Sequence, residues 1–80
     1  MNIFVANVDF GVREDDLRDL FEEYGSVDSV KIVTDRDTGR SKGYGFVEMS
    51  NNDEGLNAIS ELNGKEINGR ALVVKISKPS

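Results

Sequence analysis

The 80-residue chain contains no cysteine and no histidine. Without cysteine it can form no disulfide and no thiolate zinc site, and it has no thiol nucleophile. Without histidine it lacks the side chain that most often transfers protons near neutral pH. A chain of this length buries only about 60–65% of its extended surface, so it builds one core that packing alone must stabilise. We therefore expect residues 1–80 to form one small domain.

Long apolar stretches are also missing. No segment approaches the ~20 apolar residues that a membrane helix needs. Residues 1–9 have neither a basic start nor a long apolar run, so we expect no signal peptide. From these absences we expect a soluble, cytoplasmic protein that has no membrane partner. We also expect a monomer.

Acidic residues are in excess, with 15 Asp and Glu against 10 Lys and Arg and a net charge of −5. This sum argues against a nucleic-acid partner, because neutralising phosphates normally requires a basic surface. The acids are unevenly placed, however. Residues 1–28 hold eight acids against two bases, whereas residues 29–80 hold seven acids against eight bases. The later part of the chain can therefore still present a basic surface.

Six segments show the hydrophobic periods that are typical of strands and helices. They follow the order strand, helix, strand, strand, helix, strand, at residues 3–8, 14–24, 27–34, 43–49, 53–62 and 71–77. This order predicts an α+β, ferredoxin-like βαββαβ sandwich, in which both helices cover one face of a four-stranded antiparallel sheet. Asn63-Gly64 and Asn68-Gly69 are turn signals before the last strand.

Capping residues and apolar faces define the two helices. The apolar face of the first helix consists of Leu17, Leu20, Phe21 and Tyr24. Gly25 is placed to cap this helix at its C-terminus. The inward face of the second helix consists of Gly55, Ala58, Ile59 and Leu62. Asn51 or Asn52 is its expected N-cap, and Gly55 lets it approach the sheet closely.

Two helices cover only one side of the sheet, so strand alternation identifies the side chains that stay uncovered. The first strand divides into a core face with Ile3 and Val5 and an open face with Asn2, Phe4 and Ala6. The third strand divides into one face with Gly43, Gly45, Val47 and Met49 and another with Lys42, Tyr44, Phe46 and Glu48. We assign the glycine face to the core, because small residues suit close contact with a helix. An exposed aromatic patch then remains, and such a patch usually marks an interaction surface.

The same alternation assigns residues of the other strands. The expected core face of the last strand consists of Leu72, Val74 and Ile76. The open face gains Lys31 and Val33 from the second strand and Val73 and Lys75 from the last. The aromatic residues expected in the core are Phe10, Phe21 and Tyr24.

Two motifs carry a family resemblance. Residues 3–8, Ile-Phe-Val-Ala-Asn-Val, resemble the hexapeptide motif of the RNA-recognition-motif family. Residues 42–49, Lys-Gly-Tyr-Gly-Phe-Val-Glu-Met, resemble its octapeptide motif, which begins basic, Gly, aromatic, Gly or Ala, aromatic. Ala6 stands where the family usually has Gly, and Met49 stands where it usually has an aromatic residue. The resemblance extends over the whole chain, which is similar to the small single-domain RNA-binding proteins of bacteria.

The resemblance implies single-stranded RNA binding on the open sheet face, without a cofactor. It implies that Phe4 and Phe46 each stack under a base, Tyr44 packs against sugars, and Lys42 pairs with a phosphate. The expected nucleic-acid-binding residues are Phe4, Tyr44, Phe46, Lys42, Lys31, Lys75, Asn2, Glu48, Arg40 and Lys78. Glu48 has three interpretations: an acceptor for a base amino group, a solvated charge, or an ionic partner of Lys31.

Three other functions compete with RNA binding. Single-stranded DNA stays open, because stacking serves both sugars. Protein binding by the sheet face is disfavoured, because protein-binding members of the family often lack one of the three aromatic residues or the lysine, and Phe4, Tyr44, Phe46 and Lys42 are all present. A hydrolase on the same architecture needs a phosphate-cradling loop and a basic residue after the first strand, and residues 7–11 are acidic there. The acids of the first helix lack a ligand spacing. We therefore expect neither an enzyme nor a metal site.

Overall fold

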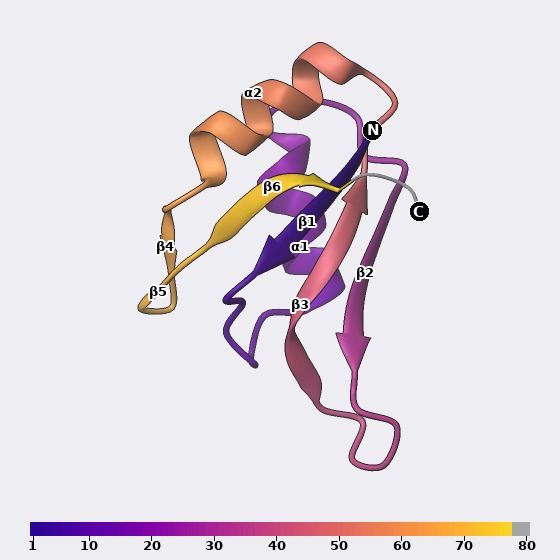
Figure 1. Cartoon of the computed structure of the whole chain (residues 1–80), viewed down its shortest axis with the longest axis vertical. Coiled ribbons are helices and arrows are strands. Elements are labelled where there is room, and N and C mark those ends of the chain that lie inside the picture. The colour runs from indigo at the N-terminus through magenta and orange to yellow at the C-terminus, as the bar shows by residue number, and fades with distance from the viewer. Residues whose placement is uncertain (78–80) are drawn as a thin grey trace.

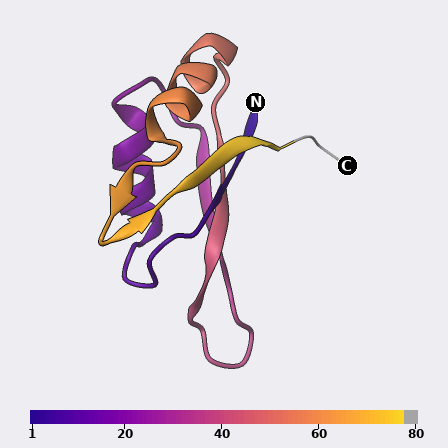
Figure 2. The same ribbon diagram turned by 60° about the vertical axis from the view of Figure 1, so that its left-hand side comes forward.

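The computed structural model describes residues 1–77. Its elements are β1 (Asn2–Ala6), α1 (Glu14–Glu22), β2 (Ser29–Thr34), β3 (Ser41–Glu48), α2 (Asn52–Leu62), β4 (Glu66–Ile67), β5 (Arg70–Ala71) and β6 (Val73–Ser77). Four of the strands form an antiparallel sheet in the order β2-β3-β1-β6. Both helices lie on one side of this sheet and leave the other side open (Figure 1, Figure 2). The predicted βαββαβ sandwich is therefore confirmed.

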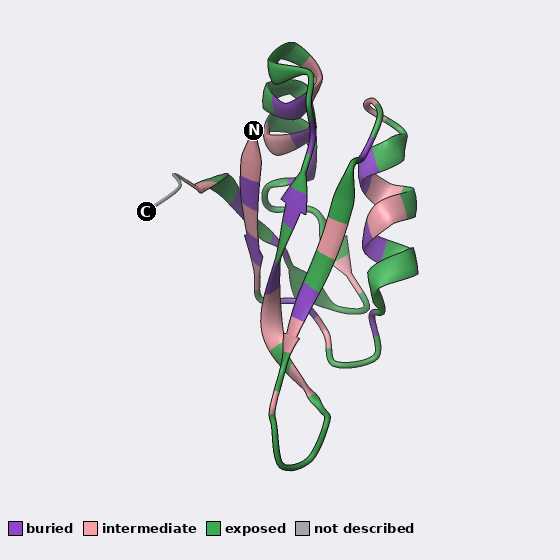
Figure 3. Cartoon of the chain, turned by 90° about the vertical axis from the view of Figure 1, so that its right-hand side faces the viewer, coloured by how far each residue is buried: buried purple, intermediate pink, exposed green. Residues whose placement is uncertain are grey.

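The core lies between the helices and the covered face of the sheet. Helix α1 packs against β2, and α2 packs against β6. The largest fully buried side chains are Phe21, Ile3, Leu17, Met49, Leu62, Leu72, Val5, Val8 and Val47. Figure 3 shows that less exposed residues alternate with exposed ones over Ser29–Ile32 of β2 and Gly45–Glu48 of β3, which follows from the two-residue period of a strand. No helix within residues 1–77 is long and apolar enough to cross a membrane.

Side-chain caps fix the starts of both helices. The Asn51 side chain accepts a 3.0 Å hydrogen bond from the backbone N–H of Glu54, as expected for an N-cap. At α1 the Asp16 carboxylate accepts from the backbone N–H of Arg13 at 2.9 Å. The predicted cap at Gly25 is wrong, because α1 ends at Glu22 and its C-cap is Glu23 in a right-handed conformation. The chain needs no left-handed residue to leave this helix.

A glycine is needed at position 45 because the backbone of the neighbouring strand β2, and not a helix, lies close to it. A Cβ at this position would lie 3.0 Å from the Ile32 Cα and still closer to the Lys31 carbonyl oxygen. The β2–β3 register shifts between Ile32 and Thr34, and the two backbones meet closely beside this shift. Helix contact, the expected reason for Gly45, is therefore not the cause. For Gly55 the expected close approach to the sheet holds, because a Cβ there would lie 3.8 Å from Ile3 Cδ1 of β1, besides 2.6 Å from the Met1 sulfur.

The end of the chain departs from the predicted single strand over residues 71–77. A small hairpin, β4–β5, precedes β6 and turns at Asn68 and Gly69, both with positive φ. Leu72 and Val74 are buried as expected, but Ile76 is 50% exposed. Ile76 continues their alternation near the end of the edge strand β6, so its assignment to the core is wrong.

Candidate nucleic-acid interface

Three aromatic rings lie together on the uncovered face of the sheet. Phe4 of β1 pairs across the strands with Phe46 of β3, and Tyr44 pairs with Ala6. The ring centroid of Phe4 lies 5.6 Å from that of Phe46 and 6.0 Å from that of Tyr44. Phe46 is 39% exposed, and Phe4 and Tyr44 are half-buried by one another. The strands thus place all three aromatic residues of the predicted binding site in one cluster, which we call the aromatic triad.

Lysines flank the aromatic triad on both sides. Lys31 of β2 pairs with Phe46, and Lys75 of β6 pairs with Phe4, so both belong to the open face as predicted. The Lys75 ammonium lies 5.9 Å from the centroid of the Phe4 ring, a distance at which a cation is attracted to the ring face. Lys42 precedes Tyr44 on β3 and is exposed. Positive charge therefore borders the rings along the width of the sheet.

The polar residues at the other end of the open face have local partners. Asn2 pairs across the strands with Glu48. The Glu48 carboxylate accepts a 3.4 Å hydrogen bond from the Ser29 hydroxyl. Among residues 1–77 the structure contains no ion pair between Glu48 and Lys31, so it does not support that interpretation of Glu48. The predicted contact at Lys78 falls outside the described residues.

Charge is divided between the two sides of the molecule. The acids of α1, Glu14, Asp15, Asp16, Asp19 and Glu22, lie on the side that the helices occupy. Glu14 also accepts a 2.9 Å hydrogen bond from the backbone N–H of Ile32, which covers the outer edge of β2. The acidic residues in the described part of the chain do not gather into a group that could hold a metal ion. The net charge of −5 therefore hides a less acidic open face.

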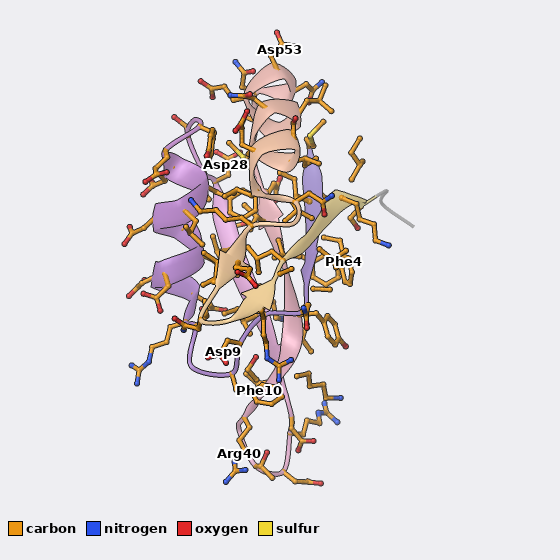
Figure 4. The ribbon with its side chains drawn as sticks, turned by 90° about the vertical axis from the view of Figure 1, so that its left-hand side faces the viewer. Phe4, Asp9, Phe10, Asp28, Arg40 and Asp53 are labelled. Carbon is orange, nitrogen blue, oxygen red and sulfur yellow. The ribbon has the colours of Figure 1, made fainter. Side chains whose placement is uncertain are left out.

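Phe10 was expected in the core, and this is wrong. Its side chain is 64% exposed, in the loop that joins β1 to α1. The Arg70 guanidinium lies 5.5 Å from the centroid of the Phe10 ring. Figure 4 shows Phe10 beyond the end of the sheet, near the β2–β3 loop that carries Arg40. Arg40 is exposed and lies in the β2–β3 loop, two residues before Lys42.

Sequence reasoning missed Phe10 and Arg70 as members of one cluster. Arg70 donates a 3.3 Å hydrogen bond to the Asn7 side chain and lies 3.9 Å from the Asp9 carboxylate. Asn7 in turn donates to the Ala71 carbonyl at 2.8 Å, with its own φ at +56°. The loop after β1 is thereby tied to the β4–β5 hairpin. The only sequence signal was an aromatic residue in a polar, non-periodic segment.

Comparison with known families and proteins adds to this geometry. Residues 3–73 match the sequence model of a protein family, the RNA recognition motif. RbpE of Nostoc sp., which carries a provisional RNA-binding designation, is 47% identical over 79 residues, covering 99% of this chain and 80% of RbpE. The human cleavage stimulation factor subunit 2 tau variant is 47% identical over 73 residues, covering 91% of this chain. That match spans only 12% of the human protein.

Two solved structures have the same fold. The crystal structure of RNA-binding protein PG1 has a TM-score of 0.92 and 48% identity, covering 100% of this chain and 99% of that one. The structure of the Rna15 RRM with bound RNA (GU) has a TM-score of 0.88 and 29% identity, covering 98% of this chain and 83% of that one. The predicted resemblance is confirmed over nearly the whole length of the chain.

Proposed function

The chain belongs to the RNA recognition motif family, and we propose from this premise that it binds single-stranded RNA on its open sheet face. The observation that carries the proposal is the aromatic triad, on the one face that the helices leave uncovered. Each stacked base contributes roughly 1–3 kcal/mol with little demand on its identity. All the rings and lysines come from one chain, so the site is complete in a monomer and works by binding alone, without catalysis.

Each ring of the triad has a distinct task in this proposal. Phe4 stacks under one base, and Phe46 stacks under the neighbouring base. Tyr44 packs against the sugars between them, since its ring lies 6.0 Å from Phe4 and it stands two residues before Phe46 on β3. The rings of Phe4 and Phe46 are tilted by 55° rather than parallel. Two bases on them therefore splay apart, which suits a single strand and not a duplex.

The lysines supply the sequence-independent attraction. Lys42 pairs with a phosphate beside Tyr44, and Lys31 and Lys75 extend the phosphate track to both edges of the triad. Lys75 covers the face of the Phe4 ring in the free protein. An incoming base takes its place there and frees the ammonium for a phosphate. With so few cations near the face, we expect micromolar affinity and a shallow dependence on salt.

Single-stranded DNA is the competing ligand. Stacking serves both polymers, and only contacts to the 2′-hydroxyl separate them. The structure of Rna15 with bound RNA favours RNA, because the two chains share the fold over 98% of this one. Protein binding by the sheet face is less favoured, because flat, partly exposed rings bordered by lysines fit bases and phosphates.

The proposal is tested by fluorescence anisotropy with labelled single-stranded RNA, single-stranded DNA and duplex RNA. We compare the wild type with the double variant Phe4→Ala/Phe46→Ala. The control is Leu56→Ala, which removes another exposed apolar side chain (46%) from α2, on the covered side. We expect binding of single strands, strongest for RNA, and its loss in the double variant alone. Equal binding by a folded double variant rules out stacking on these rings.

A further inference from the structure

Phe10 is the most exposed large hydrophobic side chain among residues 1–77. Single exposed apolar residues are common and need no function. This one differs because other groups hold it in place and because it lies beside Gly43, the residue before Tyr44 of the aromatic triad. An aromatic ring held in solvent at this position is a candidate contact for a ligand.

The surroundings of Phe10 are preorganised. The Arg70 guanidinium lies 5.5 Å from the ring centroid, and hydrogen bonding to Asn7 and ion pairing with Asp9 anchor it there. Asp9 also accepts a 3.0 Å hydrogen bond from the backbone N–H of Gly11, directly after the ring. These contacts fix the loop on both sides of Phe10. The ring is still 64% exposed, so it remains available to a ligand.

The position of the ring continues the proposed RNA site. The backbone N–H of Val8 donates a 2.9 Å hydrogen bond to the Gly43 carbonyl, which holds the loop against β3. A Cβ on Gly43 would lie 3.5 Å from the Phe10 ring, so the ring sits beside the residue that joins Lys42 to Tyr44. A strand of RNA that passes Tyr44 along this end of the sheet therefore reaches Phe10 next.

Space and charge beside the ring suit a nucleotide. An open hollow is lined by Phe10, Gly11, Gly39, Arg40 and Ser41. Figure 4 shows Phe10 and the Arg40 side chain at this same end of the molecule. Arg40 and Lys42 are exposed, and Arg70 already balances the nearby Asp9 carboxylate. Aromatic and guanidinium planes are both surfaces on which bases stack.

We propose that Phe10 and Arg70 form an additional base-binding site, which takes a nucleotide of the same RNA beyond those on the aromatic triad. Arg40 contacts the phosphate that leads into the hollow. This inference rests on the proposed function and deepens it, because it extends the bound segment past the edge of the sheet. It assigns the exposed loop residue a part in setting the length of RNA that the protein covers.

A length series separates this site from the triad. Affinities are measured for single-stranded RNAs of mixed sequence, from ~3 to ~9 nucleotides, with the wild type and the variants Phe10→Ala, Phe10→Leu and Phe46→Ala. Circular dichroism and thermal melting confirm that each variant is folded. We expect Phe10→Ala and Phe10→Leu to weaken binding of the longer RNAs by about 5- to 100-fold and to leave the shortest unchanged. Phe46→Ala weakens binding at every length.

Two results overturn the inference while the proposed function stands. In the first, both Phe10 variants bind long RNA as the wild type does, although Phe46→Ala weakens binding. In the second, Phe10→Leu binds like the wild type and only Phe10→Ala is weaker, because then an apolar side chain is enough and stacking is not involved. Failure of the wild type to bind RNA of any length overturns the proposed function together with the inference.

Discussion

Phe4 and Phe46 are direct cross-strand partners, and their ring centroids lie 5.6 Å apart on the uncovered face of the sheet. The β1–β3 register fixes this pairing, since a slip of β1 by one residue turns Phe4 to the covered face while Phe46 stays on the open one. Burial of Ile3 and Val47, the neighbouring pair on the covered face, stabilises that register. The same packing that folds the protein therefore holds the two rings ready for bases.

Truncating Phe46 separates binding from stability. Phe46→Ala removes a stacking ring whose side chain is already 39% exposed in the free protein. We expect the affinity for single-stranded RNA to fall by about 5- to 100-fold, with a melting temperature close to that of the wild type. Anisotropy and thermal denaturation measure the two effects. An affinity within error of the wild-type value contradicts the assignment of Phe46.

The lysines of the open face set the dependence on salt. Lys42→Ala removes one proposed phosphate contact, so the slope of log affinity against log salt should become shallower by about 0.7. Lys65→Ala is the matched control, because Lys65 is exposed in the loop between α2 and β4 and adjoins neither the triad nor its flanking lysines. Titrations at several salt concentrations measure both slopes. Equal slopes for the two variants exclude a phosphate contact at Lys42.

Gly45 tolerates no side chain, because the backbone of β2 occupies the space. Gly45→Ala should lower the free energy of unfolding by about 3 kcal/mol through overpacking against the Lys31 carbonyl and Ile32. Gly64→Ala meets nothing within 4 Å and bears only the strain of φ at +86°, so it should cost about 1 kcal/mol. Urea denaturation ranks the two variants. The reverse order contradicts the close β2–β3 approach.

The last strand offers a paired test of burial. Leu72→Ala removes a side chain that is only 2% exposed and should cost about 2–5 kcal/mol. Ile76→Ala shortens a side chain that is 50% exposed on the edge strand, and its cost should stay below about 1 kcal/mol. The same denaturation measurement applies. Similar losses at both positions indicate that something covers Ile76 in solution.

The sequence predicted the parts of the molecule that follow a period. Strand alternation placed Phe4, Tyr44 and Phe46 on the open face, and helical spacing placed Phe21 and Leu17 in the core. Both predictions are confirmed, because the period of a segment directly fixes which side of it is buried. The order of the six segments predicted the fold, and the family motifs added the expected ligand, which periodicity does not specify.

The errors arose where the environment of a residue depends on another segment. Phe10 lies in a loop without a period, so its partner Arg70, sixty residues later, was invisible in the sequence. The true neighbour of Gly45 belongs to β2, and only strand pairing reveals it. Ile76 follows the alternation of Leu72 and Val74, but it lies near the end of an edge strand and is half exposed. The sequence pattern does not distinguish such an edge position from a central, buried one.

The most direct test of the open face as the RNA site is a two-dimensional NMR titration of the labelled protein with single-stranded RNA. The amide signals of β1, β3 and β6 around Phe4, Phe46 and Lys75 should shift progressively, while those of α1 stay in place. Shifts confined to α1 and α2, with an unchanged open face, contradict the account.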